Sequence, residues 1–526
     1  MLAQLHSGRA RRAAVGAALW LGIAAPTVQA QGLLDAACTP GQKVIVTDYQ
    51  GAPSSTNGRG HDMAAFVRGK DGGGIDRDYL MLVWSKDSGQ GAGGISFYNW
   101  DTPSSWGGAP VLRKKIVDAT LREAHSTPVT NMFANDWRTW VLQATNGLSV
   151  YNLDSIAAPV LVKNVLVPGA QATDYSGGAV WFLALAAPYI YVAQADQGLK
   201  IFKFTDPADP TKVVFQSQYA KEYFGHRVNA VWVRGNRIVV AAVQENYGVT
   251  VADISAPATL ASKVTYGLGS TPPVRNAYGW TLNGTSLYAA AKPQGTLPSA
   301  LAIYELDPAS WALLSKKEVA GKCSTAAYVA IQDNDAFIGL SNCVHKIRRD
   351  TKGTPNPSDD TFAKVSPPPP NDPPPPDPPW SIGIVGADND FPTPFGNALF
   401  LGNDHNSTPG SAILCHAAAI DAVKPVVNGR NPVAGATGVA VTSAVGLSFS
   451  DNLKPWTISK TTLPIRVKAT QAVVDGYYSY QLNIVNFRPV QPFAPGTAYD
   501  VVVTSGVKDL AGNSAIASTA TFTTAP

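Results

Sequence analysis

The stretch Gly198-Leu199-Lys200-Ile201-Phe202-Lys203-Phe204-Thr205 is one of five copies of a pattern that decides the fold. The pattern begins with a small residue and two aliphatic residues that are separated by one residue. Often an aromatic residue follows, and then a hydrophobic residue and Asp, Ser or Thr. Its first aliphatic residues, at positions 95, 148, 199, 249 and 301, are 53, 51, 50 and 52 residues apart. A period near fifty built from alternating apolar positions is typical of a propeller or another repeat array. Weaker echoes lie at Val344 and Ile413.

Each copy is surrounded by further strand-like runs. About ten residues before the pattern lies a second apolar run, and in the middle repeats a third run precedes that one. After the pattern come an Asp/Pro turn and a fourth run, as at 213–215. Four short antiparallel strands per repeat form a propeller blade, whereas β-sandwiches would show no fifty-residue echo. The second run occurs seven times, so we expect an all-β fold with a seven-bladed β-propeller over residues 31–424, six or eight blades being less favoured. The seven runs are 79–83, 140–142, 189–193, 237–241, 286–290, 336–339 and 398–401.

The first thirty residues have the pattern of a secretory signal peptide. Arg9, Arg11 and Arg12 precede an apolar run over 13–25 and the small-residue site 28–30, so we expect cleavage after residue 30. Removing three Arg lowers the formal net charge from +4 to +1, which gives no electrostatic reason to expect nucleic acid as a partner. No later apolar run is long enough to cross a bilayer. We therefore expect a secreted or periplasmic protein, either free or associated with the cell surface.

Four cysteines allow three pairings in an oxidising compartment. Cys323 and Cys343 flank one repeat, and Cys38 and Cys415 lie at the two ends of the repeat array. The lone strand expected at 43–47 would complete the last blade and bring Cys38 beside Cys415. We therefore predict the disulfides Cys38–Cys415 and Cys323–Cys343.

The repeats resemble a known family. The pattern over 198–210, which ends in Asp-Pro-Ala-Asp-Pro, is similar to the LVIVD repeat of bacterial secreted β-propellers, and the resemblance covers roughly residues 40–422. It implies an extracellular or surface protein without an assigned reaction. A Pro-rich run over 366–379 has few backbone donors, and we interpret it as a solvent loop inserted near the last blade.

From about residue 425 the fifty-residue period ends and alternating strand and turn signals follow. The segments 508–513 (Lys-Asp-Leu-Ala-Gly-Asn) and 522–524 (Phe-Thr-Thr) resemble the bacterial Ig-like domain of surface-layer and exported proteins. The resemblance implies an Ig-like sandwich over 425–526, used as a spacer or as a carbohydrate or cell-wall module. This part contains no cysteine.

The loops that lead into the inner strands of a propeller surround its central channel, where ligand sites tend to form. The residues expected at this channel mouth are His61, His125, Tyr175, His226, Arg275 and Asp388. Imidazoles with a carboxylate could bind a divalent metal, and a histidine beside an acid could act as a general base. Packing between blades explains the same residues, and it is the simpler interpretation.

No standard catalytic motif occurs in the sequence, and we predict no catalytic residue and no cofactor. The hypothesis that fits best is a monomeric, non-catalytic binding or scaffold protein whose partner is an extracellular polymer or a cell-surface component. One alternative is an extracellular propeller enzyme, a hydrolase or lyase acting on a glycan or lactone. The other is a metal-binding periplasmic protein.

Overall fold

The computed structural model describes residues 37–46, 61–84, 93–99, 110–118, 120–121, 124–134, 136–170, 178–243, 248–320, 326–340, 343–354, 359–365, 380–381, 392–402 and 411–526. The expected signal peptide and the Pro-rich run at 366–379 lie outside these residues. The structure is nearly all β, with one short helix, α1 (Lys221–Phe224), and one 3-10 helix, η2 (Pro455–Thr457), in the described part. No helix among the described residues is both long and apolar enough to cross a membrane.

Four-stranded antiparallel units follow one another along the chain, each with its strands in sequence order. The first and second units are β2 (His61–Lys70), β3 (Asp76–Trp84), β4 (Gly93–Asn99), β5 (Leu112–Asp118), and β6 (Val129–Thr130), β7 (Thr139–Ala144), β8 (Gly147–Asn152), β9 (Val160–Leu166). The third and fourth are β10 (Phe182–Ala186), β11 (Tyr189–Ala193), β12 (Leu199–Phe204), β13 (Val213–Tyr219), and β14 (Ala230–Arg234), β15 (Arg237–Ala241), β16 (Val249–Asp253), β17 (Ala261–Tyr266).

The later units continue the same order. The fifth and sixth are β18 (Ala277–Asn283), β19 (Ser286–Ala291), β20 (Ala300–Leu306), β21 (Leu313–Ala320), and β22 (Ala326–Gln332), β23 (Asp335–Leu340), β24 (Cys343–Asp350), β25 (Thr361–Val365), with β26 (Trp380–Ser381) also paired to β24. A last unit contains β27 (Thr393–Phe395), β28 (Ala398–Leu401), β29 (Ser411–Cys415) and, from the start of the chain, β1 (Lys43–Val46).

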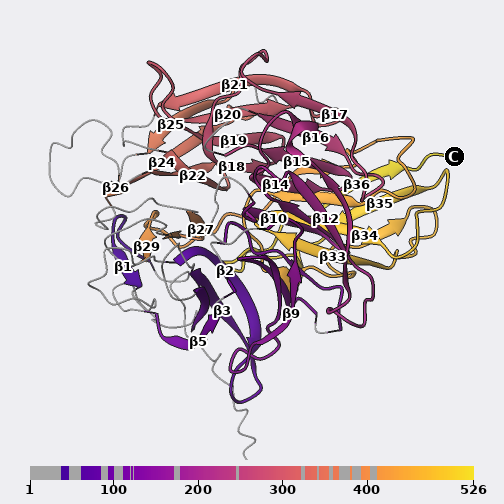
Figure 1. Cartoon of the computed structure of the whole chain (residues 1–526), viewed down its shortest axis with the longest axis horizontal. Coiled ribbons are helices and arrows are strands. Elements are labelled where there is room, and N and C mark those ends of the chain that lie inside the picture. Colours follow the sequence, from indigo (N-terminus) through magenta and orange to yellow (C-terminus); the bar gives the residue numbers. More distant parts are fainter. Residues whose placement is uncertain are drawn as a thin grey trace, which may run out of the picture.

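The units meet through their first strands. β10 contacts β14, β14 contacts β18, β18 contacts β22, β22 contacts β27, and β27 contacts β2. In Figure 1 the units follow one another around a common centre, with β2, β3 and β5 near β1, β29 and β27. This arrangement corresponds to the blades of a propeller. The sheets stay separate and form no closed barrel, and the total of seven blades stays a prediction because several connecting stretches lie outside the described residues.

The repeated sequence pattern forms the third strand of each unit because that strand is covered on both faces. In β12, five of six positions are buried, whereas none of the seven residues of the outer strand β13 is. Apolar side chains of neighbouring units interlock: Val141 and Val150 of the second unit pack with Ile190 and Val192 of the third. A strand buried on both faces has mostly apolar residues. Because each unit contains one such strand, the apolar pattern returns about every fifty residues.

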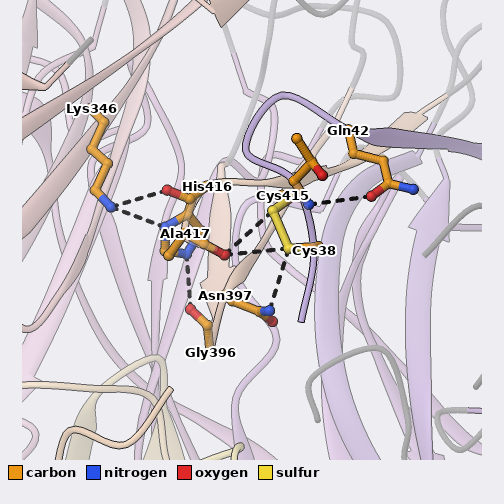
Figure 2. The surroundings of a disulfide bond; sticks show 9 residues. Cys38, Gln42, Lys346, Gly396, Asn397, Cys415, His416 and Ala417 are labelled. Atoms are coloured by element: carbon orange, nitrogen blue, oxygen red, sulfur yellow. Dashed lines mark hydrogen bonds between the residues drawn. A yellow bond between two sulfur atoms is a disulfide. The ribbon is translucent and has the colours of Figure 1, made fainter. Parts of the chain in front are cut away.

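The start of the chain joins the last unit. β1 pairs antiparallel with β29, from Lys43 opposite Leu414 to Val46 opposite Ser411. A disulfide links Cys38 to Cys415 across 377 positions of sequence. Figure 2 shows this bond, with the Asn397 amide 3.4 Å from Cys38 Sγ. The lone N-terminal strand thus completes the last unit, as expected. The other predicted pair includes Cys323, which lies outside the described residues.

The C-terminal part is an Ig-like sandwich (yellow in Figure 1) that follows the propeller in the chain. Phe493, Tyr499 and Phe522 make ring contacts in its core, with centroids 4.6 to 5.5 Å apart. One sheet contains β30 (Val427–Asn431), β31 (Val445–Phe449), β33 (Gly476–Gln481) and β34 (Ile484–Pro489), and the other β32 (Ile465–Val467), β35 (Ala498–Val503) and β36 (Ser518–Thr523).

The Ig-like domain shares a sheet with the propeller. β33 pairs antiparallel with β6, with Ser479 opposite Thr130 and Tyr480 opposite Val129, so that β30, β31, β34 and β33 continue into the second unit. β6 is only two residues long and is the inner edge of its unit; an unpaired edge is a ready template for another strand. A spacer would need no such pairing, and the domain is instead built into the propeller.

Candidate functional site

The β33–β34 hairpin of the Ig-like domain lies against the inner strands of the propeller. The Ser479 hydroxyl donates to the Leu185 carbonyl at 2.7 Å, and the Gln481 amide donates to the Leu183 carbonyl at 2.6 Å. Farther along, the Asn486 amide donates to the Val233 carbonyl at 2.9 Å. These bonds fix the hairpin against β10 and β14, the inner strands of the third and fourth units.

The tip of this hairpin, Leu482 and Asn483, closes one side of a central cavity. The other walls come from β2, β10, β18, β22 and β27, which are inner strands of five units. About 40 Å³ can hold the centres of water molecules, and one water needs roughly 10–15 Å³ of such volume. Within the described residues, the cavity therefore has room for about three water molecules. Its lining includes Met63, His125, Phe182, Trp280, Tyr328 and Pro394.

His125 is the predicted site residue that reaches this cavity. It is buried, and its ring stacks on Trp181 with centroids 5.1 Å apart. Nδ1 lies 2.6 Å from the Trp181 carbonyl, and the backbone N–H donates to Gln143 Oε1 at 2.6 Å. These contacts hold the imidazole between the second and third units, facing apolar walls.

His226 and Arg275 lie elsewhere. His226 is buried against its own unit, with Nε2 2.9 Å from Thr250 Oγ1 and Nδ1 2.5 Å from the Arg227 carbonyl. Arg275 is buried too, and donates to Glu318 at 3.1 Å and to the Pro298 carbonyl at 2.8 Å. Neither residue lines the central cavity. Both fasten strands and loops of their units, which is the packing interpretation of the sequence.

The other predicted site residues cannot be placed beside His125. The structure describes the backbone of His61 at the start of β2 but not its side chain, and Tyr175 and Asp388 lie outside the described residues. The shared ligand site of six residues therefore stays a prediction, and the structure places two of its members away from the cavity. Gly248 makes room for the His226 imidazole, because a Cβ there would lie 2.2 Å from the ring.

The burial of His226 predicts a pH dependence of stability. Burial lowers its pKa from 6.5 to about 4, so the neutral imidazole is favoured in the folded state. Its stabilising contribution is complete above pH 6.5 and is lost as the pH falls toward 4, by up to about 3 kcal/mol. In urea unfolding between pH 4 and pH 7, His226→Gln should have a shallower fall in stability than the unsubstituted protein. Equal slopes would contradict this assignment.

One group of carboxylates among the described residues is close enough to share a metal ion, and the sequence analysis missed it. Asp421, Asp451 and Asp509 place carboxylate oxygens within 4.8 Å of one another. Asp509 belongs to the Lys-Asp-Leu-Ala-Gly-Asn segment quoted above, but the sequence gives no sign of its two partners. None of the three lines the central cavity, and the group lies where the Ig-like domain meets the sixth unit.

The comparisons with known proteins agree on the C-terminal part. Residues 421–524 match the bacterial Ig-like domain family. The LVIVD repeat family does not match the chain, so the resemblance of the propeller to this repeat stays a prediction. A search of curated proteins finds no match.

Several solved structures are similar to the chain at low identity. One is described as the extracellular domain of a one-component system of B. thetaiotaomicron, with 8% identity and a TM-score of 0.40; the match covers 92% of this chain but only 59% of that one. A second is the computationally designed protein Ika8, with 12% identity, a TM-score of 0.36, and 73% and 99% coverage. A third, from Bacteroides uniformis and described as a 6-phosphogluconolactonase, has 12% identity, a TM-score of 0.39, and 61% and 94% coverage.

Proposed function

We propose that this chain is a non-catalytic extracellular binding or scaffold protein in which the propeller and the Ig-like domain act as one rigid body. Bacterial Ig-like domains of the matched family occur in extracellular proteins. The observation that carries the proposal is the strand pairing of β33 with β6, together with the hairpin tip that closes the central cavity. A propeller enzyme acting on a glycan would need an open channel at this place. The partner, an extracellular polymer or cell-surface component, would bind the outer surface.

Binding assays can separate this proposal from the enzyme alternative. The purified secreted form would be sedimented with peptidoglycan sacculi, with washed bacterial cells and with extracellular polysaccharide. We expect it to sediment with at least one of these, and His125→Gln to retain binding within about twofold, because a side chain outside the contact surface is nearly neutral for affinity. Circular dichroism would confirm that the variant folds.

The same preparations test for turnover. Release of reducing sugars or opening of a lactone by the unsubstituted protein, abolished by His125→Gln, would replace the binding proposal with an enzymatic one. Absence of sedimentation with all three materials would also contradict it.

A further inference from the structure

Five polar residues from separate segments meet where the Ig-like domain rests on the sixth propeller unit. Gln332 ends β22, and Asp333 begins the turn into β23. Asp421 lies in the connection from β29 to β30, Asp451 follows β31, and Asp509 lies between β35 and β36. The propeller, the connection and both sheets of the sandwich thus each supply a member.

The carboxylates of Asp421, Asp451 and Asp509 form a compact oxygen cluster. Their potential ligand atoms lie within 4.8 Å of one another. Oxygens bound to one calcium ion at a Ca–O distance of roughly 2.4 Å lie at most about 4.8 Å apart, so these atoms are close enough to share one ion. Asp451 is 2% and Asp509 0% exposed, while Asp421 is half-buried and leaves a path from solvent.

Two oxygen atoms in this cluster lack hydrogen-bond partners among the described residues. Asp509 Oδ1 accepts the Asn513 N–H at 2.7 Å, but Asp509 Oδ2 accepts nothing although the residue is fully buried. Gln332, 5% exposed, turns its amide toward the carboxylates, with Nε2 3.4 Å from Asp451 Oδ2 and 3.5 Å from Asp421 Oδ2, and its Oε1 is likewise unpartnered. Buried polar atoms without partners are rare, and a bound ion or an ordered water is one way to satisfy them.

The cluster also lacks a balancing positive charge in the described part of the chain. In the sixth unit, the basic side chains of Lys346 and Arg348 bind Asp335 instead, at 2.9 and 2.7 Å. Burial, then the charges of neighbouring carboxylates, raise the pKa of Asp451 well above its usual value, and burial raises the pKa of Asp509 to about 6. Asp333, tied to Ser450 by a 3.0 Å hydrogen bond, adds another acid at the edge. Buried carboxylates of this kind are normally paired or coordinate a metal.

We propose that Asp421, Asp451 and Asp509 bind one calcium ion that joins the connection to the two sheets of the Ig-like domain, beside Gln332 of the sixth unit. An all-oxygen ligand set with several carboxylates is the kind that calcium prefers. Because the ion would bridge three segments of the chain that are far apart in sequence, its binding stabilises the folded Ig-like domain. The site is independent of the partner that the propeller surface binds.

Calcium binding to the full secreted chain is the direct test. After treatment with EDTA and dialysis, titration calorimetry at pH 7 should show one calcium per chain with a Kd between about 10⁻⁶ and 10⁻³ M. Calcium at saturating concentration should raise the Tm by roughly 2 °C or more, with a smaller effect of magnesium. Terbium bound in place of calcium should emit when tyrosine is excited, because Tyr480 lies near the site. The pKa of Tyr480 is raised mainly by burial and further by the charge of Asp451, which shows that the two side chains are close.

Matched variants give the proposal a clear outcome. Asp451→Asn and Asp421→Asn should weaken calcium binding on the order of 100-fold, because even residues behind the ligands alter affinity 10–100-fold. Both variants keep the side-chain shape and remove a crowded charge, so they should fold. The control Asp475→Asn removes a carboxylate that is 83% exposed in the same domain, and should bind calcium as the unsubstituted protein does. Absence of saturable binding, equal affinity of all three variants, or an equal response to magnesium would each overturn the assignment.

Discussion

Gly446→Ala should release the Ig-like domain from the propeller and destabilise the protein by at least about 3 kcal/mol, beyond the usual range for overpacking. Gly446 lies in β31, against the turn that joins β14 to β15. A Cβ at this position would be 2.0 Å from the Gly235 nitrogen and 2.5 Å from the Arg234 carbonyl carbon. Both are backbone atoms, so no side-chain rotation can relieve the clash.

Separation of these strands would also break the polar contacts that surround them. The Gly235 N–H donates to Asn486 Oδ1 at 2.8 Å, and Arg234 donates to Ser448 Oγ at 2.7 Å. Arg234 is fully buried, and its guanidinium lies 4.7 Å from the Trp311 ring centroid. A buried charge that loses its partners costs far more than an exposed one. The free-energy cost of the added methyl group therefore includes the cost of leaving the buried Arg234 charge without its hydrogen-bond partners.

Thermal unfolding and limited proteolysis would measure this effect. Gly446→Ala should lower the Tm and expose the connection at 416–426 to protease. Gly269→Ala is the matched control, because a Cβ there meets nothing within 4 Å and the backbone has no positive φ. If both variants unfold at the same temperature, the docking seen in the structure does not contribute to stability.

The sequence predicted the repeated strands well because their pattern is imposed by burial. The expected runs at 189–193, 237–241 and 398–401 coincide with β11, β15 and β28. In each of these strands nearly every side chain lies between two sheets. The start of the chain could also be placed, since a lone strand and two distant cysteines both required a partner at the far end.

The docking of the two domains could not be predicted, because no local pattern encodes it. β33 reads as an ordinary strand of an Ig-like sheet, and β6 has only two residues. Their pairing depends on the fit of the whole hairpin between β6, β10 and β14. The aspartate cluster was missed for the same reason: its members are separated by 30 and 58 positions (421, 451 and 509) and meet only in the folded chain.

The candidate ligand residues show where equal spacing misleads. His125 and His226 precede the inner strands of the second and fourth repeats, but of these two only His125 lines the cavity. His226 turns instead over Gly248 and toward Thr250 of its own unit. The repeat sets the backbone position, and the local neighbour then sets the direction of the side chain.

Replacing both Cys38 and Cys415 with serine should reduce stability by about 3–6 kcal/mol. The disulfide closes a loop of 377 positions, for which the loop-closure entropy corresponds to roughly 6 kcal/mol as an upper value. β1 would then be held by its four residues paired with β29 and by a few hydrogen bonds beside them. In one of these, the Gly41 N–H donates to the Cys415 carbonyl at 2.9 Å. Such a short strand at a chain end opens easily without a tether.

Urea unfolding of the double serine variant against the unsubstituted protein measures this contribution without a reductant, which would also act on any Cys323–Cys343 bond. Amide exchange at Val44 and Val46 should accelerate in the variant, because the loss of the tether lets β1 separate from β29. Exchange in the fourth unit should change less, since β14–β17 pair only with one another in their own sheet. A stability difference below about 1 kcal/mol, with β1 still protected, would mean that strand pairing alone holds β1 on β29 and that the disulfide restricts the unfolded chain far less than loop-closure entropy requires.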